Sequence, residues 1–450
     1  MSIRLWCISI CLASSVASAM PTTDLWSAYQ DAFKNDPIYQ QQKAQLQETE
    51  QEVPAARAAL LPQLLLTGQG SHTYQTSEIL GDVDYGSNQY TINFNQAILN
   101  FAAMNALYNA KLSVQAAVEL FSAQTQDLMV RFVRAYLNTL QTRDLMRYAK
   151  SQRNFSKDFL KMTSRMRELK FATITQYEQA KQQYEVLSGQ YVLAKIAYIQ
   201  NLQNLSNITA VLYHRLPRVN THFHPIKLFP QNVKAWEDKA RAQNLFLRSA
   251  QTDMHAAEVE IGTKKMDFLP NVSAITNYSD VNQLSTQAAD ASDDEVRATV
   301  VGISASWNFV EGGQTIADVK KAMAQYANAS AVVQQRYLQA INDARNAFIG
   351  INDGAEGVDA SYEAIQTGTS GLQHMQKGFR AGVQTLADVL QMQNTLYAAQ
   401  KQYAQSFYSY ILSTILLKQA AGTLSPQDLY RLNLYLFGKK HEHAYVKSAR

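Results

Sequence analysis

Cysteine is nearly absent from the sequence, and the two that occur, Cys7 and Cys11, stand close to its start. Both lie in a stretch with the marks of a secretory signal peptide, in which Arg4 precedes a short apolar run and Ala17-Ser18-Ala19 offers small residues for cleavage. We expect residues 1–19 to be removed on export. The mature chain would then hold no cysteine, which excludes a disulfide framework, a thiol nucleophile and a thiolate metal site.

A long apolar run is also missing. No stretch after the signal peptide holds the roughly 18 to 20 apolar residues that a membrane-spanning helix needs. The chain could therefore cross a lipid bilayer only as a β-barrel, because helices and closed barrels alone satisfy their backbone groups in lipid. Basic charge is not clustered either, since the formal net charge is only +4, and we expect no nucleic-acid partner.

The sequence offers little that would support catalysis or a bound cofactor. It has no glycine-rich phosphate loop and no pairing of a nucleophile with a base, so we do not expect an enzyme. Two His-x-His pairs, His222 with His224 and His441 with His443, have no third ligand near them. We therefore expect no metal site and no cofactor.

Proline is scarce, and the gaps between prolines indicate how the chain is organised. Pro62 and Pro217 bound one proline-free window, and Pro270 and Pro426 bound a second. We expect the first window to hold a helical hairpin with its turn near 169–175, whose arms have about 60 residues and a length of about 90 Å. Helices so long and so polar must pack against others as coiled coils.

The second window repeats the first. When 212 is added to each residue number, the apolar stripe of one predicted hairpin arm falls on that of the other, and Tyr191 falls on Tyr403. The apolar-Leu-Pro-amide phrases at Pro62 and Pro270 stand 208 positions apart. At both, proline would end a helix and begin a strand, because it cannot continue the helix and favours an extended residue before it. We infer a tandem duplication.

The duplication predicts the order of segments along the chain. We expect a signal peptide at 1–19, a first repeat at 20–211, a linker at 212–244, a second repeat at 245–422, and a C-terminal segment with a basic tail at 423–450. Each repeat would begin with a helix and continue with a strand hairpin and a long helical hairpin, at about 63–98 and 100–211 in the first and at about 271–310 and 314–422 in the second.

The expected strands alternate between apolar and polar side chains. Tyr90, Ile92 and Phe94 fall on one face, and so do the alternate residues from Val301 to Phe309. The opposite faces carry amides, hydroxyls and glycine with almost no charge. A soluble sandwich usually has a charged outer face, whereas a transmembrane barrel turns its apolar face to lipid and its polar face to a water-filled lumen. Four strands are too few to close a barrel, so several chains would have to share one.

Several motifs spread over the mature chain resemble those of one family. They are "NDP" at Asn35–Pro37, "FVEGGQT" at Phe309–Thr315, "FRAGVQTLADVLQMQNTLYAAQ" at Phe379–Gln400 and "AAGTLSPQDL" at Ala420–Leu429, together with the two Leu-Pro-amide phrases. In this duplicated layout they resemble the TolC-type outer-membrane exit ducts of Gram-negative efflux pumps and type I secretion systems. The resemblance covers essentially the whole mature chain.

The resemblance implies an α+β membrane protein that forms a homotrimer in the cell outer membrane. Four strands from each chain would build one 12-stranded transmembrane β-barrel, continuous with a long α-helical barrel in the periplasm. A mixed α/β equatorial belt, formed by the linker at 212–244 and the segment from Ser425, would surround the helices. Such a duct passively conducts small molecules or secreted proteins to the exterior. Its implied partners are a periplasmic adaptor, an inner-membrane pump and outer-membrane lipid.

The resemblance also assigns residues to the closed end of the tunnel. Asp388 and Gln391 would line the pore constriction, with Gln391 standing where the family has a second acid. Carboxylates of Asp388 that face one another across the axis would favour bound cations and cation selectivity. Contacts between neighbouring helix tips would fall on four residues that cannot form the family's ionic lock: Thr175, Gln176, Phe379 and Gln384.

Three alternatives stay open. Asp388 could be no more than a solvated helix residue. The helical hairpins alone would also suit a soluble periplasmic coiled-coil adaptor or structural protein, although the nearly uncharged strand faces argue against it. Finally, the glycines between Gly350 and Gly382 could keep one hairpin arm flexible, or could allow two helices to pack closely.

Overall fold

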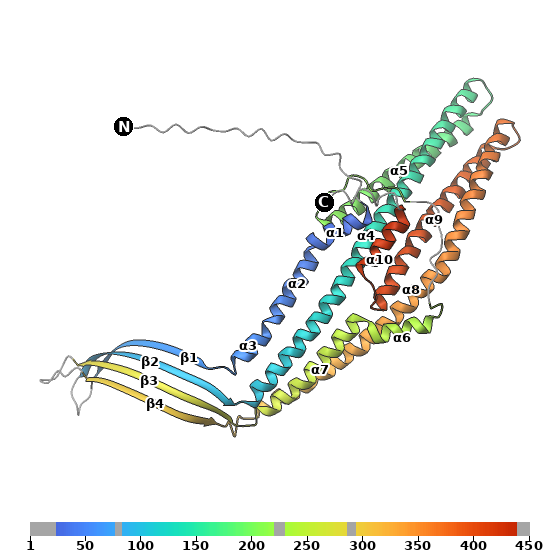
Figure 1. Cartoon of the computed structure of the whole chain (residues 1–450). Helices are drawn as coiled ribbons and strands as arrows, with labels where there is room; N and C mark the ends of the chain where they lie inside the picture. Colours follow the sequence, from blue (N-terminus) through green and yellow to red (C-terminus); the bar gives the residue numbers. More distant parts are fainter. Residues whose placement is uncertain (1–23, 77–82, 220–229, 286–293, 439–450) are drawn as a thin grey trace, which may run out of the picture.

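The computed structural model describes residues 24–76, 83–219, 230–285 and 294–438. The expected signal peptide, both His-x-His pairs and residues 439–450 of the expected C-terminal segment lie outside these ranges. Figure 1 shows an elongated molecule with a β-sheet at one end and the tips of two helical hairpins at the other. Short helices gather beside the hairpins in the middle of its length.

The chain forms a similar series of elements twice. The first series is α1 (Leu25–Asn35), α2 (Pro37–Glu50), α3 (Glu52–Ala58), β1 (Gln63–Gln75), β2 (Val83–Leu99), α4 (Phe101–Glu168) and α5 (Ile174–Thr209). The second is α6 (Val233–Gln243), α7 (Leu245–Met266), β3 (Asn271–Ser285), β4 (Asp294–Ser306), α8 (Gln314–Arg380), α9 (Leu386–Ala420) and α10 (Pro426–Phe437).

The two arms of each helical hairpin differ greatly in length. α4 and α8 have 68 and 67 residues, whereas α5 and α9 have 36 and 35. The expectation of about 60 residues for each arm of the first hairpin is wrong for α5, which ends at a left-handed Ala210. Shorter helices cover the remaining half of α4, with α2 and α3 on one side and α7 on another. Composition predicts a helix, but it does not predict where that helix changes partners.

None of these helices combines enough length with enough hydropathy to cross a membrane, within the residues that the structure describes.

The strands form one antiparallel sheet in the order β1-β2-β3-β4. The register aligns Leu64 with Phe94, Phe94 with Thr276, and Thr276 with Val301, so these four side chains form one row across both repeats. Leu64 and Val301, at the two ends of this row, are 71% and 76% exposed. The alternating pattern of the sequence thus corresponds to one face of the sheet, which is apolar near the helices at Leu64, Phe94 and Val301 and charged farther out, where Asp280 pairs with Arg297.

The fourth strand is shorter than the sequence pattern predicted. β4 ends at Ser306, so Trp307 and Phe309 lie beyond it. The Trp307 indole Nε1 donates to the Phe268 carbonyl oxygen at 3.0 Å, and its ring lies 5.2 Å from that of Phe309. The two aromatic rings therefore pack against each other at the junction between sheet and helices, where the chain turns into α8.

Glycines on α8 allow α9 to approach closely, which supports close packing among the two alternatives for these residues. A Cβ atom on Gly350 would lie 2.6 Å from Ser413 Oγ, and one on Gly368 would lie 3.3 Å from Leu396 Cδ1. The glycines that would place a Cβ within 4 Å of an α9 side chain are Gly350, Gly354, Gly357, Gly368 and Gly371. Small residues at such a seam bring two helix backbones together.

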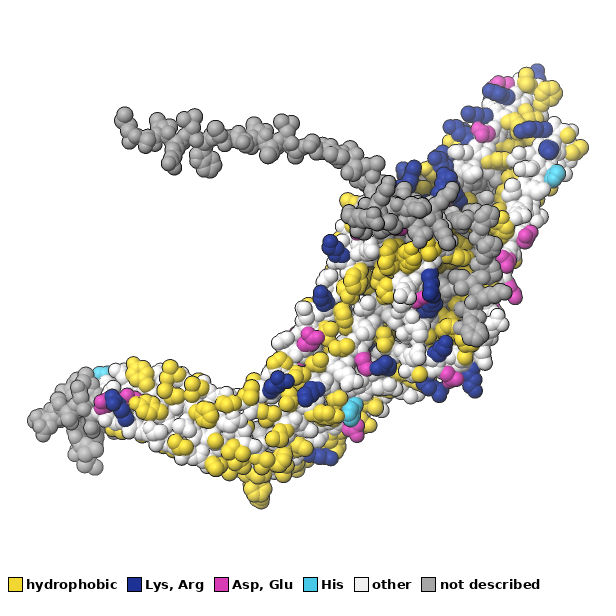
Figure 2. All heavy atoms as spheres, in the orientation of Figure 1, with side chains coloured by type: hydrophobic (Ala, Val, Ile, Leu, Met, Phe, Trp, Pro, Cys, Tyr) yellow, Lys and Arg dark blue, Asp and Glu magenta, His cyan; other side chains and the backbone are white. Residues whose placement is uncertain are grey.

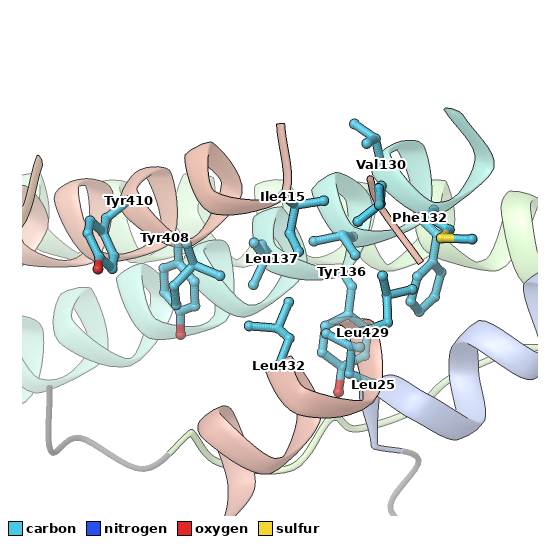
Figure 3. Packing of buried hydrophobic residues seen from close by; sticks show 14 of the residues in the cluster. Leu25, Val130, Phe132, Tyr136, Leu137, Tyr408, Tyr410, Ile415, Leu429 and Leu432 are labelled. Atoms are coloured by element: carbon cyan, nitrogen blue, oxygen red, sulfur yellow. The ribbon is translucent and has the colours of Figure 1, made fainter. Parts of the chain in front are cut away.

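The main hydrophobic core lies where both termini of the described chain meet α4. Leu25 of α1, Tyr136 of α4 and Leu429 of α10 are fully buried and point toward one another (Figure 3). Asn433 joins the same helices through buried hydrogen bonds, accepting from the Leu25 amide at 3.1 Å and donating to the Asp24 carboxylate at 2.9 Å. The N-terminal and C-terminal helices are thereby held together on one side of the hairpins.

Replacing Gly422 with Ala should destabilise the protein by roughly 3 kcal/mol or more. Gly422 has a φ of 66°, and a Cβ atom there would collide with the backbone carbonyl oxygen of Gln243, which cannot move aside as a side chain can. Gly357→Ala is the matched control, because its Cβ would meet only Ser406 Oγ at 3.9 Å. That substitution should instead stabilise by about 0.5–1 kcal/mol. Thermal unfolding followed by circular dichroism would compare them, and equal shifts would contradict this account.

Candidate functional site at the helix tips

Both hairpins turn in the same way at their tips. Lys170 in the first tip and Gly382 in the second have left-handed φ values of 63° and 79°. Thr173 and Thr385 then cap the helices that return, α5 and α9, and each takes part in a capping box. Corresponding residues of the two tips stand 212 positions apart, which is the spacing predicted from the internal repeat of the sequence. The two tips therefore use one local design.

Asp388 is the acidic member of the second capping box. Its carboxylate accepts from the Thr385 amide at 2.9 Å and from the Thr385 hydroxyl at 2.7 Å. The Asp388 amide in turn donates to Thr385 Oγ1 at 3.3 Å. These hydrogen bonds, chiefly the one from the Thr385 side chain, lower the pKa of the Asp388 carboxyl, because they favour its charged form. Within one chain, Asp388 thus stabilises the first turn of α9.

Gln176 occupies the corresponding position of the first tip. Its side-chain Oε1 accepts from the Thr173 amide at 2.9 Å, and its own amide donates to Thr173 Oγ1 at 3.2 Å. A neutral amide therefore does at the first tip what a carboxylate does at the second. The family resemblance assigned Gln176 to contacts between neighbouring tips. Within the single chain, its side chain instead forms the capping box with Thr173.

A small apolar cluster joins the two tips within one chain. Its buried members are Phe159 of α4, Ala180 of α5, and Leu386 and Val389 of α9. Phe379, near the end of α8, packs against this cluster with its ring 5.1 Å from that of Phe159. The structure thus places Phe379 between the first and second hairpins of the same chain.

The remaining candidate residues at the tips are solvent-exposed. Thr175, Gln384 and Gln391 all face water in the single chain. The Gln384 side chain also lies over Gly378, where a Cβ atom would come within 2.7 Å of its Cγ. The single chain therefore leaves these three side chains open to contact with a neighbouring molecule.

At the opposite end of the helices, the structure places both candidate prolines between a helix and a strand. Pro62 follows the end of α3 and precedes β1, and Pro270 follows the end of α7 and precedes β3. A side chain in β2 and one just beyond β4 donate hydrogen bonds to backbone carbonyl groups at these breaks. Gln96 Nε2 donates to the Leu60 carbonyl oxygen at 2.8 Å, and Trp307 Nε1 donates to that of Phe268.

Sequence comparison gives this architecture a family. The sequence profile of the family described as "Outer membrane efflux protein" matches residues 28–211 and again residues 236–423. The chain belongs to this outer membrane efflux protein family. The two matched ranges start 208 positions apart and end 212 apart, which agrees with the two spacings of the predicted duplication. The predicted resemblance to TolC-type ducts is confirmed.

Relatives with known roles cover nearly all of the chain. The chain is 27% identical to the outer membrane protein TolC of Vibrio cholerae over 93% of its own length and 95% of that protein. It is 23% identical to the alkaline protease secretion protein AprF of Pseudomonas aeruginosa, over 90% and 85% of the two chains. The crystal structure of the Campylobacter jejuni CmeC outer membrane channel matches with a TM-score of 0.78 at 15% identity, over 96% and 97% of the two chains.

These matches agree with the expected α+β fold class, and the four-stranded sheet with its helical hairpins is consistent with one chain of a trimeric barrel. As a member of the outer membrane efflux protein family, the chain is an exit duct of efflux and type I secretion. Its location is the outer membrane, with a helical tunnel that extends into the periplasm.

Sequence reasoning identified Thr385 in the Gly-x-x-Thr-x-x-Asp-Val pattern of the second tip, from Gly382 to Val389, but did not identify Thr173 in the first tip. The signal was present in the sequence, since Thr followed three residues later by Gln or Asp is the capping-box pattern. In the phrase from Gly382 to Val389, glycine supplies the left-handed turn, threonine and aspartate form the cap, and Val389 is fully buried. Gly382, Thr385, Asp388 and Val389 therefore each have a local structural role.

Thr385→Ala should raise the pKa of Asp388 toward its ordinary value of 3.8, because the hydroxyl that favours the carboxylate is removed. A pKa lowered by folding means that the cap stabilises the tip above about pH 3.8 and loses this effect as the pH falls through the folded pKa. The wild-type tip should therefore fray in acid, whereas the variant should fray already at neutral pH. Hydrogen exchange of the first amides of α9 would measure this.

Thr173→Ala is the matched control at the first tip. Its partner Gln176 does not titrate, so the loss of protection there should be the same at every pH. A pH-dependent response at the first tip, or a pH-independent one at the second, would contradict the assignment of Asp388 as the titrating cap.

Proposed function

We propose that this exit duct is a homotrimer whose three sheets close into one 12-stranded barrel. The observation that supports it is the single four-stranded sheet, in which β1 and β4 each have one neighbour. An apolar face such as this one suits lipid, and lipid does not tolerate unpaired strand edges. A soluble periplasmic adaptor, the alternative from the sequence, would have no use for so large an exposed apolar sheet face.

Exposed apolar side chains on α5 also support assembly with further copies. Val186, Leu193 and Ile196 stand on one side of this helix at steps of seven and three residues and are 48%, 67% and 45% exposed. Side chains at such steps form a stripe on one helix face. A neighbouring hairpin in the trimer would cover this stripe and bury it from water.

We further propose the domain division that follows from this assembly. The repeats at 20–211 and 245–422 would supply the barrel and the tunnel, and the linker at 212–244 together with the segment from 423 would form the equatorial belt. The position of α6 and α10 beside the hairpins supports this division (Figure 1). The belt would encircle the tunnel at the level of the main hydrophobic core.

The duct's implied partners are a periplasmic adaptor and an inner-membrane pump. We propose that the adaptor docks between the belt and the hairpin tips. Two contacts with the proposed belt mark the outward face of α4. Tyr136 packs with α1 and α10, and Arg143 donates to the linker carbonyl oxygen of Leu216 at 3.2 Å. Continuing in steps of three, four and seven residues, this face carries the exposed basic stripe of α4: Arg147, Lys150, Lys157, Lys161 and Arg165.

The corresponding face of α8 is acidic. Arg345 binds Glu237 of α6 at 2.8 Å, which marks the side of α8 that faces the belt. Toward the tip of the second hairpin, the same face carries the exposed side chains of Glu356, Asp359 and Glu363. Figure 2 shows Lys and Arg side chains gathered toward the tip of the first hairpin and acidic side chains along the edge formed by the second. A partner with both acidic and basic side chains could bind the basic stripe of α4 and the acidic face of α8 through complementary charges.

We propose that Asp388 lines the narrow end of the tunnel in the trimer, together with Gln391. Its position at the tip and its partly exposed side chain support this role, which adds to its role as a cap. Thr175, Gln176, Phe379 and Gln384 would lie near the contacts between neighbouring tips, with the exposed Thr175 and Gln384 the best placed to reach another chain. We also infer that the chain is a passive conduit and no enzyme, as the names of its channel and secretion relatives suggest.

Asp388→Gln tests the acidic constriction without removing the cap, since Gln176 shows that an amide can serve in the same box. In planar bilayers the purified wild-type duct should give small, cation-preferring conductance steps. The variant should keep the channels and lose most of their preference for cations, because the ring of charge is removed. Failure of folded wild-type protein to form channels would disprove the duct. Unchanged selectivity in the variant would remove Asp388 from the constriction.

Reversing the charge of the basic stripe should weaken adaptor binding. The triple variant Lys157→Glu, Lys161→Glu and Arg165→Glu should raise the Kd for a purified periplasmic adaptor of the same cell at least about tenfold at low salt, and less at high salt. The control makes the same charge change at exposed lysines of α2 and of the first turns of α8: Lys43→Glu, Lys320→Glu and Lys321→Glu. Equal effects from both triple variants would indicate a general effect of the protein's net charge and would argue against a docking surface on α4.

A further inference from the structure

A cavity opens where one helix replaces another between α4 and α8. On the tip side α9 packs against both of these helices, and on the sheet side α7 does so. The two helices meet end to end, because Asn244 at the start of α7 donates through Nδ2 to the Ala420 carbonyl oxygen at the end of α9, at 3.0 Å. The cavity at this junction has a volume of about 490 Å³, and residues of α4, α7, α8 and α9 line it.

The cavity lies on the side of the long helices that faces away from α6 and α10. On α8, Arg345 binds α6, and Asp343 stands two residues earlier, which is about 200° around the helix. On α4, Tyr136 packs with α1 and α10, and Arg134 likewise stands two residues before it. Asp343 and Arg134 both line the cavity. If α6 and α10 encircle a tunnel, the cavity lies in the inner wall of that tunnel.

Two charged side chains of the cavity have no partner within the described chain. Neither Asp343 nor Arg134 forms an ion pair or a hydrogen bond with another described residue. The surrounding helices displace part of the water around the Asp343 carboxyl, and this burial raises its pKa. Asp127, the other acid of the lining, is paired with Arg131 at 2.9 Å. Among the described lining residues, Asp343 is therefore the one uncompensated carboxylate.

Arg336 supplies a positive charge at some distance from this carboxylate. It stands seven residues before Asp343 on the same side of α8, which corresponds to a rise of about 10 Å. Its guanidinium carbon lies 5.6 Å from the centre of the Phe246 ring, and Nη1 donates to Gln339 Oε1 at 3.4 Å. The cavity thus offers a carboxylate and a guanidinium about two helical turns apart, with an aromatic ring beside the guanidinium.

We propose that this cavity binds small aromatic zwitterions inside the tunnel. The ammonium group of the ligand pairs with Asp343, its carboxylate pairs with Arg336, and its aromatic ring lies against Phe246. Arg134 offers the carboxylate a second cation from α4. A ligand with only one of the two charges leaves one end of the cavity unpaired and binds less tightly. The inference rests on the proposed function, because only a closed assembly makes this side of the helices a tunnel wall, and it names a class of cargo for that tunnel.

The tripeptide Gly-Trp-Gly is the probe, because it carries an ammonium group, an indole ring and a carboxylate. Its N-acetylated form lacks the ammonium group and is otherwise the same. Calorimetric titration of the purified full-length protein would measure the Kd of each probe. Asp343→Asn should raise the Kd for Gly-Trp-Gly about fivefold, because one ion pair is lost, and should leave the Kd for the acetylated probe unchanged.

Asp359→Asn is the matched control, because it makes the same change at an exposed position on the acidic face of α8. It should change neither Kd. Asp343→Glu keeps the charge and should keep the preference for Gly-Trp-Gly over its acetylated form. Arg134→Gln combined with Arg336→Gln tests the other end of the ligand. This double variant should weaken binding of Gly-Trp-Gly and leave binding of its C-terminal amide unchanged.

The binding site would be overturned if Gly-Trp-Gly did not bind the wild type, if folded Asp343→Asn bound it equally well, or if both probes or both aspartate variants lost affinity equally. Single-channel recording tests the location in the tunnel. Gly-Trp-Gly should interrupt the wild-type current, and at a low concentration the blocked fraction of time should fall about fivefold in Asp343→Asn. Binding without interruption would overturn the location. A wild type that conducts no ions would disprove the duct, while calorimetry would still report on the cavity.

Discussion

The backbone groups along the outer edges of the sheet constrain the rest of this molecule. Within the described sheet, β1 and β4 each pair with one strand, which leaves a row of N–H and C=O groups on each. Lipid offers these groups no partner, so further strands must supply one. Closure by copies of the same chain meets this need and gives the hairpins neighbours. The exposed apolar stripe on α5 would then be covered, and the long helices would stand in a ring.

Duplication supplies two halves that fold alike but have diverged in charge. Both tips turn through a left-handed residue and restart with a threonine cap, at Thr173 and Thr385. The partner of that cap is neutral in the first tip and acidic in the second. Exposed side chains between the main core and the tips differ in the same sense, with a basic stripe on α4 and acidic side chains on α8. One local fold therefore presents two chemically distinct surfaces around the tunnel.

The packing between the hairpins is graded along their length. In the middle of the molecule, α1 and α10 close an apolar core over α4, and Asn433 joins the two ends of the described chain. Toward the tips this core gives way to amide contacts and one small cluster around Phe159. A rigid middle and a weakly joined end are what a tunnel needs if it is to open at one end without unfolding.

Much of this architecture was predictable from the sequence because it depends on local, periodic patterns. Alternation in the strands gave the apolar face, proline marked the breaks at Pro62 and Pro270, and the repeat spacing of 212 aligned the hairpins. The sequence did not reveal that β4 ends at Ser306 or that Asp388 caps its own helix. Nor did it bring Asp343 and Arg134 to one cavity. Periodicity determines which face of an element is apolar, whereas the partner of that face, and the point where partners change, depend on contacts between residues far apart in the chain.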